Sequence, residues 1–322
     1  MTVPNSLILL YTRKCKLLCP VCKHLSDPNE NIVLSEKYSK IIILQAKRVP
    51  SIKKIIFTGG ESFSHIEILK KSIRFAKAHR FITNFLVNSY LIRDIENTLL
   101  KLETLSLNGL KEISLSMHDF CDIDDATYFN EEAMLLVLSK AMELNLKVEF
   151  FVSLTSETMF NNLYLRSFLE KNNLLTNIEI TEVVDKSCDG IGSKKLISND
   201  AFYLCNKLGE SLAVLPDGRV SFCVGRALFT DRQDIFILGN LSQIPLFVLV
   251  GRVKKMLRSL NELKNEHENI QHAKNSGCEC CLFSGQRYHQ FFGTFEIIKN
   301  KWEKMQELKL ERKQKKARSL SD

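Results

Sequence analysis

A regular alternation of strand and helix patterns runs from Ser6 to about residue 184 and restricts the chain to one class of fold. Short apolar runs predict strands, and segments with apolar positions three and four residues apart predict amphipathic helices. The predicted strands are residues 7–11, 55–58, 85–87, 113–117, 148–154 and 178–183, and the helices between them are 34–48, 64–80, 91–107, 130–144 and 158–171. This order predicts an α/β fold with parallel strands, and such folds bind ligands at the carboxyl ends of the strands.

Three cysteines follow the first predicted strand in a Cys-x3-Cys-x2-Cys loop, formed by Cys15, Cys19 and Cys22. Soft thiolate ligands select iron-sulfur clusters, zinc or copper(I). Zinc normally takes a fourth ligand from a separated pair, and His24 lies too close to Cys22 in sequence to turn back onto the same ion. Three thiolates on one loop favour a 4Fe-4S cluster in which one iron has no protein ligand.

A second motif, Gly59-Gly60-Glu61, follows the predicted strand 55–58. Two residues without side chains let a ligand approach the backbone closely. The carboxylate that follows can accept a charge-assisted hydrogen bond from the ammonium group of an amino acid. The motif therefore predicts a site for a ligand with an amino-acid end.

Together the two motifs resemble the radical SAM superfamily. Cys15, Cys19 and Cys22 match its cluster loop, although Val21 stands where many members have an aromatic residue, and Gly59-Gly60-Glu61 matches the stretch that holds the methionine end of S-adenosylmethionine (AdoMet). The resemblance implies an open six-unit (β/α)6 partial TIM barrel. It also implies AdoMet-pocket roles for further residues, namely Asn88, Ser89, Ser116 and the backbone near Glu182.

Past residue 184 the pattern changes, and Asp217-Gly218 between two apolar segments predicts a hairpin over residues 212–223. Cysteines precede and end this hairpin, and a Cys-x2-Cys pair comes later. The arrangement resembles the SPASM and shorter twitch modules of some radical SAM enzymes. It implies one auxiliary 4Fe-4S cluster on Cys205, Cys223, Cys278 and Cys281, with Cys280 as a substitute for either neighbour. In the alternative, Cys205 is a buried structural cysteine and three thiolates bind.

These patterns divide the chain into residues 1–190 as the barrel, 191–298 as the auxiliary module and 299–322 as a basic C-terminal helix and tail. With 322 residues and 45% hydrophobic residues, the chain can bury a sizeable core. No apolar run reaches the roughly 20 residues of a membrane span, and no export signal starts the chain, so we expect a cytoplasmic protein that does not bind membranes. Ten cysteines in such a protein indicate metal ligands more than disulfides. The net charge of +8 is concentrated in the tail, which we expect to be solvated and not to bind nucleic acid.

The resemblance implies reductive cleavage of AdoMet to a 5′-deoxyadenosyl radical, with the electron supplied by a flavodoxin- or ferredoxin-type partner. The layout is most similar to compact peptide epimerases, and it implies a peptide substrate. Those enzymes tend to have a thiol beside the hairpin cysteine, where this chain has Val224. Epimerisation would then use Cys188, Cys121 or Cys280 as hydrogen donor, and otherwise a thioether or carbon-carbon crosslink is expected. The alternatives are a small-molecule dehydrogenase or mutase, and a non-catalytic metal-binding scaffold, against which Gly59-Gly60-Glu61 argues.

Overall fold

The structure is a computed structural model that describes residues 3–16, 24, 26–88, 94–117, 131–154, 162–174, 178–184, 202–204, 209–222, 237–254 and 270–272. Its main sheet has nine strands in the order β10-β9-β8-β1-β2-β3-β4-β5-β6. Six of these, β1 to β6, are parallel neighbours in chain order: β1 (Ser6–Leu10), β2 (Lys54–Thr58), β3 (Ile82–Asn88), β4 (Glu112–Met117), β5 (Lys147–Leu154) and β6 (Ile178–Val184). The predicted parallel α/β sheet is confirmed.

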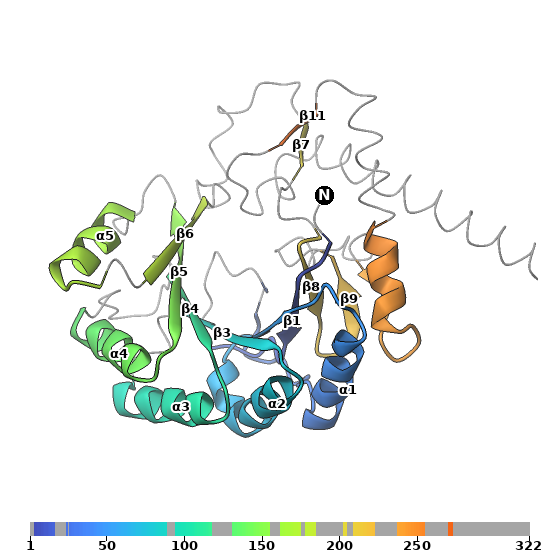
Figure 1. The fold of residues 1–322 in the computed structure, drawn as a ribbon, viewed down its shortest axis with the longest axis horizontal. Coiled ribbons are helices and arrows are strands. Elements are labelled where there is room, and N and C mark those ends of the chain that lie inside the picture. Colours follow the sequence, from blue (N-terminus) through green and yellow to red (C-terminus); the bar gives the residue numbers. More distant parts are fainter. Residues whose placement is uncertain are drawn as a thin grey trace, which may run out of the picture.

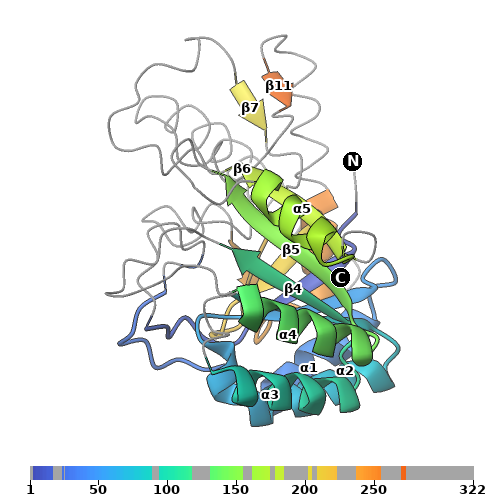
Figure 2. The same ribbon diagram turned by 90° about the vertical axis from the view of Figure 1, so that its left-hand side faces the viewer.

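Five helices alternate with these strands: α1 (Glu36–Lys47), α2 (Ile66–Ala78), α3 (Ile95–Leu107), α4 (Glu131–Glu143) and α5 (Asn162–Lys171). The sheet is curved, and all five helices lie on its outer side (Figure 1). Figure 2, turned by 90°, shows α3, α4 and α5 along the same outer side. All five helices lie close to the predicted ranges.

Capping residues explain why two helices begin later than predicted. The Ser35 hydroxyl accepts a hydrogen bond from the Tyr38 N–H and starts α1, and the Asp94 carboxylate accepts one from the Asn97 N–H and starts α3. Each cap satisfies a backbone N–H that has no partner within its helix. The short 3-10 turn η1 (Ser62–His65) precedes α2 and replaces the first turn of the helix predicted there.

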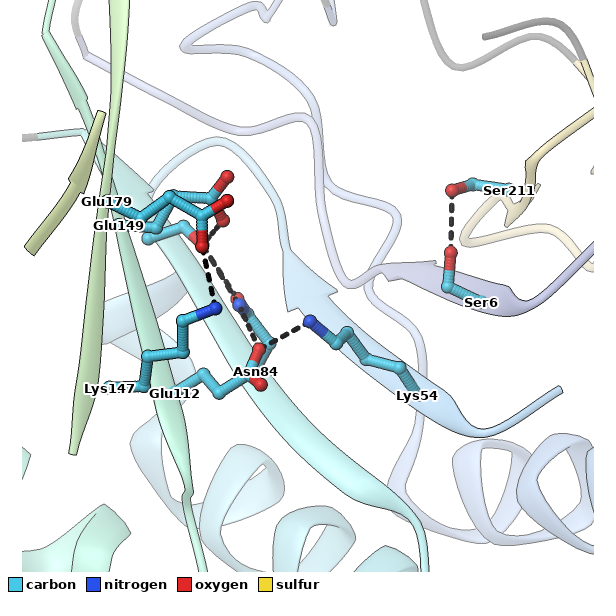
Figure 3. Close-up of polar contacts among 9 residues, drawn as sticks. Ser6, Lys54, Asn84, Glu112, Lys147, Glu149, Glu179 and Ser211 are labelled. Atoms are coloured by element: carbon cyan, nitrogen blue, oxygen red, sulfur yellow. Dashed lines mark hydrogen bonds and ion pairs between the residues drawn. The ribbon is translucent and has the colours of Figure 1, made fainter. Parts of the chain in front are cut away.

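The strands bury their two faces differently. Outward-facing side chains pack against the helices and are almost completely buried, as for Leu9, Phe57, Phe85 and Phe150. Because successive side chains in a strand point to opposite faces, the residues between them lie on the concave inner face. Several of these inner residues are polar, and Figure 3 shows their side chains pointing toward one another.

The predicted hairpin is present as β8 (Ser211–Val214) and β9 (Arg219–Ser221), which pair antiparallel. Gly218 in its turn has φ +85°, a conformation that glycine adopts without strain. β8 also pairs in parallel with β1, from Ser6 with Ser211 to Leu9 with Val214, and β10 (Ile237–Asn240) follows at the edge. The sheet therefore continues across the boundary that we predict at residue 190.

Two further strands form a separate two-stranded sheet. β7 (Phe202–Leu204) and β11 (Ile270–His272) pair in parallel, and both views place them above the open side of the curved sheet (Figures 1 and 2). Residues 246–254 are helical and follow β10, and Leu246, Leu249 and Val253 from this segment are buried. Within the described residues, no helix has both the length and the apolar character needed to cross a bilayer.

Candidate functional site

The two sequence motifs meet at the carboxyl ends of β1 and β2. The last register pair of these strands is Leu10 with Thr58, and the Tyr11 N–H donates to the Thr58 carbonyl at 2.9 Å. The pairing then continues into both loops. The Gly60 N–H donates to the Thr12 carbonyl at 2.7 Å, and the Glu61 N–H donates to the Lys14 carbonyl at 2.8 Å.

Cys15 is the only cysteine among the described residues, and it is buried, with 6% of its surface exposed. Its N–H donates to the Asp27 carbonyl at 3.3 Å, and the Asp27 N–H donates to the Arg13 carbonyl at 3.0 Å. Thr12 is also fully buried, and its hydroxyl accepts from the Lys14 N–H at 3.0 Å. The first half of the cysteine loop is thus held by hydrogen bonds on two sides.

Cys19 and Cys22 lie outside the described residues. Within the part of the chain that the structure describes, no three His, Cys, Asp or Glu side chains gather in a way that could hold a metal ion. A buried thiol beside a glycine-rich turn fits one thiolate ligand of an iron-sulfur cluster, since thiolate is the ligand such clusters take. The remaining two ligands would come from Cys19 and Cys22.

Glu61 directly precedes η1 and is half-buried. Its carbonyl accepts hydrogen bonds from both the N–H and the hydroxyl of Ser64, at 3.1 and 2.6 Å. These bonds fix the backbone around Glu61 on one side, and the bond to Lys14 fixes it on the other. The backbone of Glu61 is thus fixed on both sides, and its carboxylate can accept an ammonium group by a charge-assisted hydrogen bond.

His65 also belongs to this site, although neither sequence motif includes it. Burial lowers the pKa of His65, the Lys14 cation lowers it further and the Glu61 carboxylate opposes both effects. The His65 Nε2 atom is buried and has no hydrogen-bond partner among the described residues. The only sequence signal is its position four residues after Glu61, which places it one helical turn further on.

Tyr11 directly precedes the cysteine loop, but its side chain faces the helices and belongs to the core. Its ring is buried, with 1% exposed, and burial raises the pKa of its hydroxyl to about 12, although Ser39 and Ser72 nearby act in the opposite direction. These serines donate to carbonyls of their own helices, and the Tyr11 hydroxyl has no well-formed hydrogen bond among the described residues. Tyr11 thus packs behind the cysteine loop as a neutral group, between α1 and α2.

The other predicted AdoMet-pocket residues lie on adjacent strands. Asn88, at the end of β3, pairs with Ser116 in β4, and the neighbouring row joins Val152 of β5 with Glu182 of β6. Ser116 is half-buried, and Ser89 lies outside the described residues. The structure therefore brings Asn88 and Ser116 to the carboxyl ends of the strands, the same side of the sheet as Gly59.

A polar network lines the inner face of the sheet, closer to the amino ends of the strands (Figure 3). The Asn84 amide donates to the carboxylate of Glu112 at 3.1 Å and to the Ser114 hydroxyl at 2.9 Å, and Ser114 donates to Glu149 at 3.3 Å. Lys54 forms an ion pair with Glu112. Asn84 and Ser114 are each only 2% exposed. The alternation of polar and apolar residues along β3, β4 and β5 is the sequence signal that indicates this inner face.

A second ion pair extends the charged inner face toward β6. Lys147 Nζ lies 2.6 Å from the Glu179 carboxylate, which is the main reason that the pKa of Lys147 is raised (Figure 3). Glu112 and Glu149 raise it further. Glu149 and Glu179 are register partners and lie in one row with Leu86 and Ser114.

The predicted auxiliary ligands and the predicted hydrogen donor all lie outside the described residues. They are Cys188, Cys205, Cys223, Cys278 and Cys281, together with the alternatives Cys121 and Cys280. Two of them directly adjoin described segments, and a third follows a described strand after a short gap. Cys205 follows β7, Cys223 follows Phe222 at the end of the hairpin, and Cys278 comes six residues after the last residue of β11.

Comparison with solved structures identifies proteins of similar architecture and low sequence identity. The structure of anSMEcpe with bound AdoMet matches with a TM-score of 0.51 and 15% identity, over 76% of this chain and 80% of that chain. The chain shares the fold of this AdoMet-bound protein. Its mixed α/β architecture with a large parallel sheet is consistent with a partial TIM barrel.

Two other solved structures match with lower TM-scores. Streptococcus suis SuiB bound to S-adenosylmethionine gives a TM-score of 0.45 and 12% identity over 77% of this chain, and this chain spans 63% of the length of SuiB. BtrN in complex with AdoMet and 2-DOIA gives 0.44 and 10% identity over 83% of this chain and 92% of that chain. These neighbours are radical SAM enzymes. No family model and no curated protein matches the sequence.

Proposed function

We propose that the chain is a radical SAM enzyme that acts on a peptide. The observation that carries the proposal is the backbone pairing of the two motifs, in which Gly60 and Glu61 donate to the carbonyls of Thr12 and Lys14. This pairing supports the proposal because it joins the backbone of the segment that carries Cys15 to the backbone of the turn that carries Glu61. Both segments lie where parallel α/β folds bind their ligands. The shared fold with AdoMet-bound anSMEcpe supports the same conclusion.

Each residue of the site has a defined task in this proposal. Cys15, Cys19 and Cys22 would hold a 4Fe-4S cluster, and Glu61 would accept the ammonium group of AdoMet. A cluster held there would supply the electron for reductive cleavage of AdoMet to methionine and a 5′-deoxyadenosyl radical, the species that would take a hydrogen atom from the substrate. Asn88 and Ser116, at the carboxyl ends of β3 and β4, would contact the rest of AdoMet. A flavodoxin- or ferredoxin-type protein would supply the electron.

We assign the substrate to the carboxyl-end side of the inner face, next to Asn88 and Ser116, because parallel α/β folds bind their ligands at that end. Lys54, Glu112 and Lys147 are the first residues of β2, β4 and β5, so their ion pairs lie at the opposite, amino end of the strands. We therefore assign these ion pairs a structural role.

An auxiliary 4Fe-4S cluster on Cys205, Cys223, Cys278 and Cys281 is part of the proposal. Leu204 of β7 is the register partner of His272 of β11, so the segments that lead into Cys205 and toward Cys278 start side by side. Six extended residues span at most about 20 Å, so Cys278 stays within that distance of His272. In addition, the Gly209 N–H donates to the Phe222 carbonyl at 3.3 Å, which ties the segment after Cys205 to the residue before Cys223.

Iron analysis of anaerobically purified protein tests the cofactor assignment. We expect about eight irons per chain for two clusters, and about half of that in a Cys15→Ser variant. Formation of 5′-deoxyadenosine from AdoMet under reduction tests the activity. An iron-loaded protein that forms no 5′-deoxyadenosine, or a protein that binds zinc instead, would contradict the proposal.

The peptide substrate needs its own experiment. Co-expression with a short peptide encoded beside this chain, followed by mass analysis in deuterated solvent, distinguishes the two outcomes. Deuterium uptake at one residue with no other change indicates epimerisation, and we would then assign Cys188 as the first hydrogen donor to replace. A loss of two hydrogens indicates a thioether or carbon-carbon crosslink. An unmodified peptide in the presence of active enzyme would count against a peptide substrate.

A further inference from the structure

The ladder between β1 and β2 extends past the ends of both strands. After the last register pair, the donors Tyr11, Gly60 and Glu61 continue the contact up to the Lys14 carbonyl. The loop that carries Cys15 is therefore attached to the Gly-Gly-Glu turn at successive backbone positions. Hydrogen bonds of this kind fix the register of the two segments as they do within a sheet.

Gly60 has no room for a side chain, because the cysteine loop lies directly against it. A Cβ atom at this position would overlap the Lys14 carbonyl oxygen, and it would lie 2.7 Å from the Lys14 carbonyl carbon and 2.9 Å from the Cys15 Cβ. All of these distances are shorter than van der Waals contact. The Lys14 atoms belong to the backbone, so rotation of a side chain cannot relieve the overlap.

We propose that Gly60 is a positioning residue for the cysteine loop. Its missing side chain lets residues 12–15 lie against the Gly-Gly-Glu turn, and this contact sets the separation between the Cys15 thiol and the Glu61 carboxylate. The inference rests on the proposed function and assigns Gly60 a task that does not depend on AdoMet. A glycine that served only the approach of AdoMet would not need to touch the cysteine loop.

The proposal predicts that a methyl group at Gly60 affects the cluster before any AdoMet is added. In a Gly60→Ala variant of the full chain, we expect iron and sulfide to fall to the level of the Cys15→Ser variant. We expect the low-temperature EPR signal of the reduced N-terminal cluster to be lost. Glu61→Gln should keep the iron and the EPR signal of the wild type and lose AdoMet affinity, because it leaves the backbone ladder intact.

Thiol labelling of the metal-free full chain gives a readout that is independent of the cluster. Cys15 is buried, so its alkylation, followed by peptide mass mapping, should be slow in the wild type. Gly60→Ala should accelerate it by about fivefold or more, because overpacking favours local opening of the site by at least that factor. Gly251→Ala is the matched control, since a Cβ at Gly251 meets nothing within 4 Å, and it should leave the labelling rate unchanged.

A second variant covers the case in which Gly60→Ala fails to fold. Thr12→Val removes the hydroxyl that accepts from the Lys14 N–H, without adding volume at the turn. It should also accelerate labelling of Cys15 and lower the iron content. If foldable Gly60→Ala keeps wild-type iron, EPR signal and labelling rate while only AdoMet affinity falls, the proposal is overturned. Unchanged labelling and iron content in Thr12→Val overturn it when Gly60→Ala does not fold. A wild-type protein without iron would instead overturn the proposed function.

Discussion

The imidazole of His65 lies at the start of α2, close to both halves of the candidate site. Burial is the largest cause of its lowered pKa; the Glu61 carboxylate opposes it, and the Lys14 cation acts with it. The folded protein therefore takes up a proton at this ring less readily than the unfolded chain does. Acid should destabilise the fold through this residue, an effect that a fully solvated histidine does not have.

The sign of the pH effect follows from that lowered pKa. Above the unfolded value of about 6.5, His65 is neutral in both states and has no effect on the pH dependence. As the pH falls below about 6.5, the unfolded chain binds a proton that the folded protein does not bind, so the free energy of unfolding decreases. We expect the urea midpoint of the wild type to fall between pH 7.5 and 5.5 by more than that of His65→Gln.

The matched comparison is His79→Gln. His79 follows α2, and its Nδ1 lies 2.8 Å from the Phe75 carbonyl, so its ring has a polar partner that His65 lacks among the described residues. His79→Gln removes an imidazole at the other end of the same helix and controls for the loss of a ring as such. Equal pH dependence of the wild type and His65→Gln would show that His65 does not have the lowered pKa.

At the scale of secondary-structure elements, the hairpin β8–β9 is fixed to the barrel by α1 as well as by β1. Gly218 lies in its turn, and a Cβ there would overlap the Tyr38 hydroxyl and lie 3.0 Å from the Asn240 Oδ1 atom. The Asn240 amide in turn donates to the Asp217 carbonyl at 3.0 Å. The turn therefore has both an unusual φ and a close neighbour.

Replacing this glycine tests the contact. Gly218→Ala should lower the free energy of unfolding by about 1–2 kcal/mol, since alanine is strained at positive φ. The added methyl group against Tyr38 increases the loss. Gly251→Ala, in the helical segment 246–254, should instead be neutral or stabilising by up to about 1 kcal/mol. Urea denaturation measures both, and equal effects of the two substitutions would contradict the docking of the turn.

The local elements could be predicted from the sequence, whereas contacts between distant elements could not. Apolar periodicity indicated each strand from β1 to β6, and Asp217-Gly218 indicated the hairpin, because both signals lie within a few residues. The pairing of Ser6 with Ser211 depends on the register of strands far apart in the chain, and no local pattern encodes it. At the site, Cys15 and Glu61 came from motifs. His65 and Tyr11 depend on what packs around them, which only the fold determines.

At the scale of the whole molecule, the barrel and the hairpin share one sheet and one core. Leu212, Val214, Val220 and Phe222 are at most 1% exposed and belong to the same apolar cluster as Leu7 and Leu9 of β1. Burying four such side chains contributes about 6–12 kcal/mol, which is comparable to the stability of a whole domain. The barrel is therefore expected to depend on residues beyond 190.

A fragment of residues 1–190 tests this dependence. It removes the partner of β1 on one side and exposes Leu7 and Leu9 at a new sheet edge, so we expect aggregation or loss of cooperative thermal unfolding. Co-expression with residues 191–322 should restore a soluble complex. A fragment that unfolds cooperatively at the midpoint of the full chain would show that the hairpin contributes little to the barrel.

The same pairing has a consequence for the order of events during synthesis. β1 leads into the cysteine loop and pairs with β2 on one side and β8 on the other. Ser211, which pairs with Ser6, comes 205 residues later in the chain. β1 therefore remains an edge strand until about two thirds of the chain has left the ribosome. Contacts this distant in sequence slow folding. Iron loaded onto Cys15 before that point would meet a loop whose supporting strand is unpaired on one side, and we therefore expect stable cluster insertion to follow chain completion.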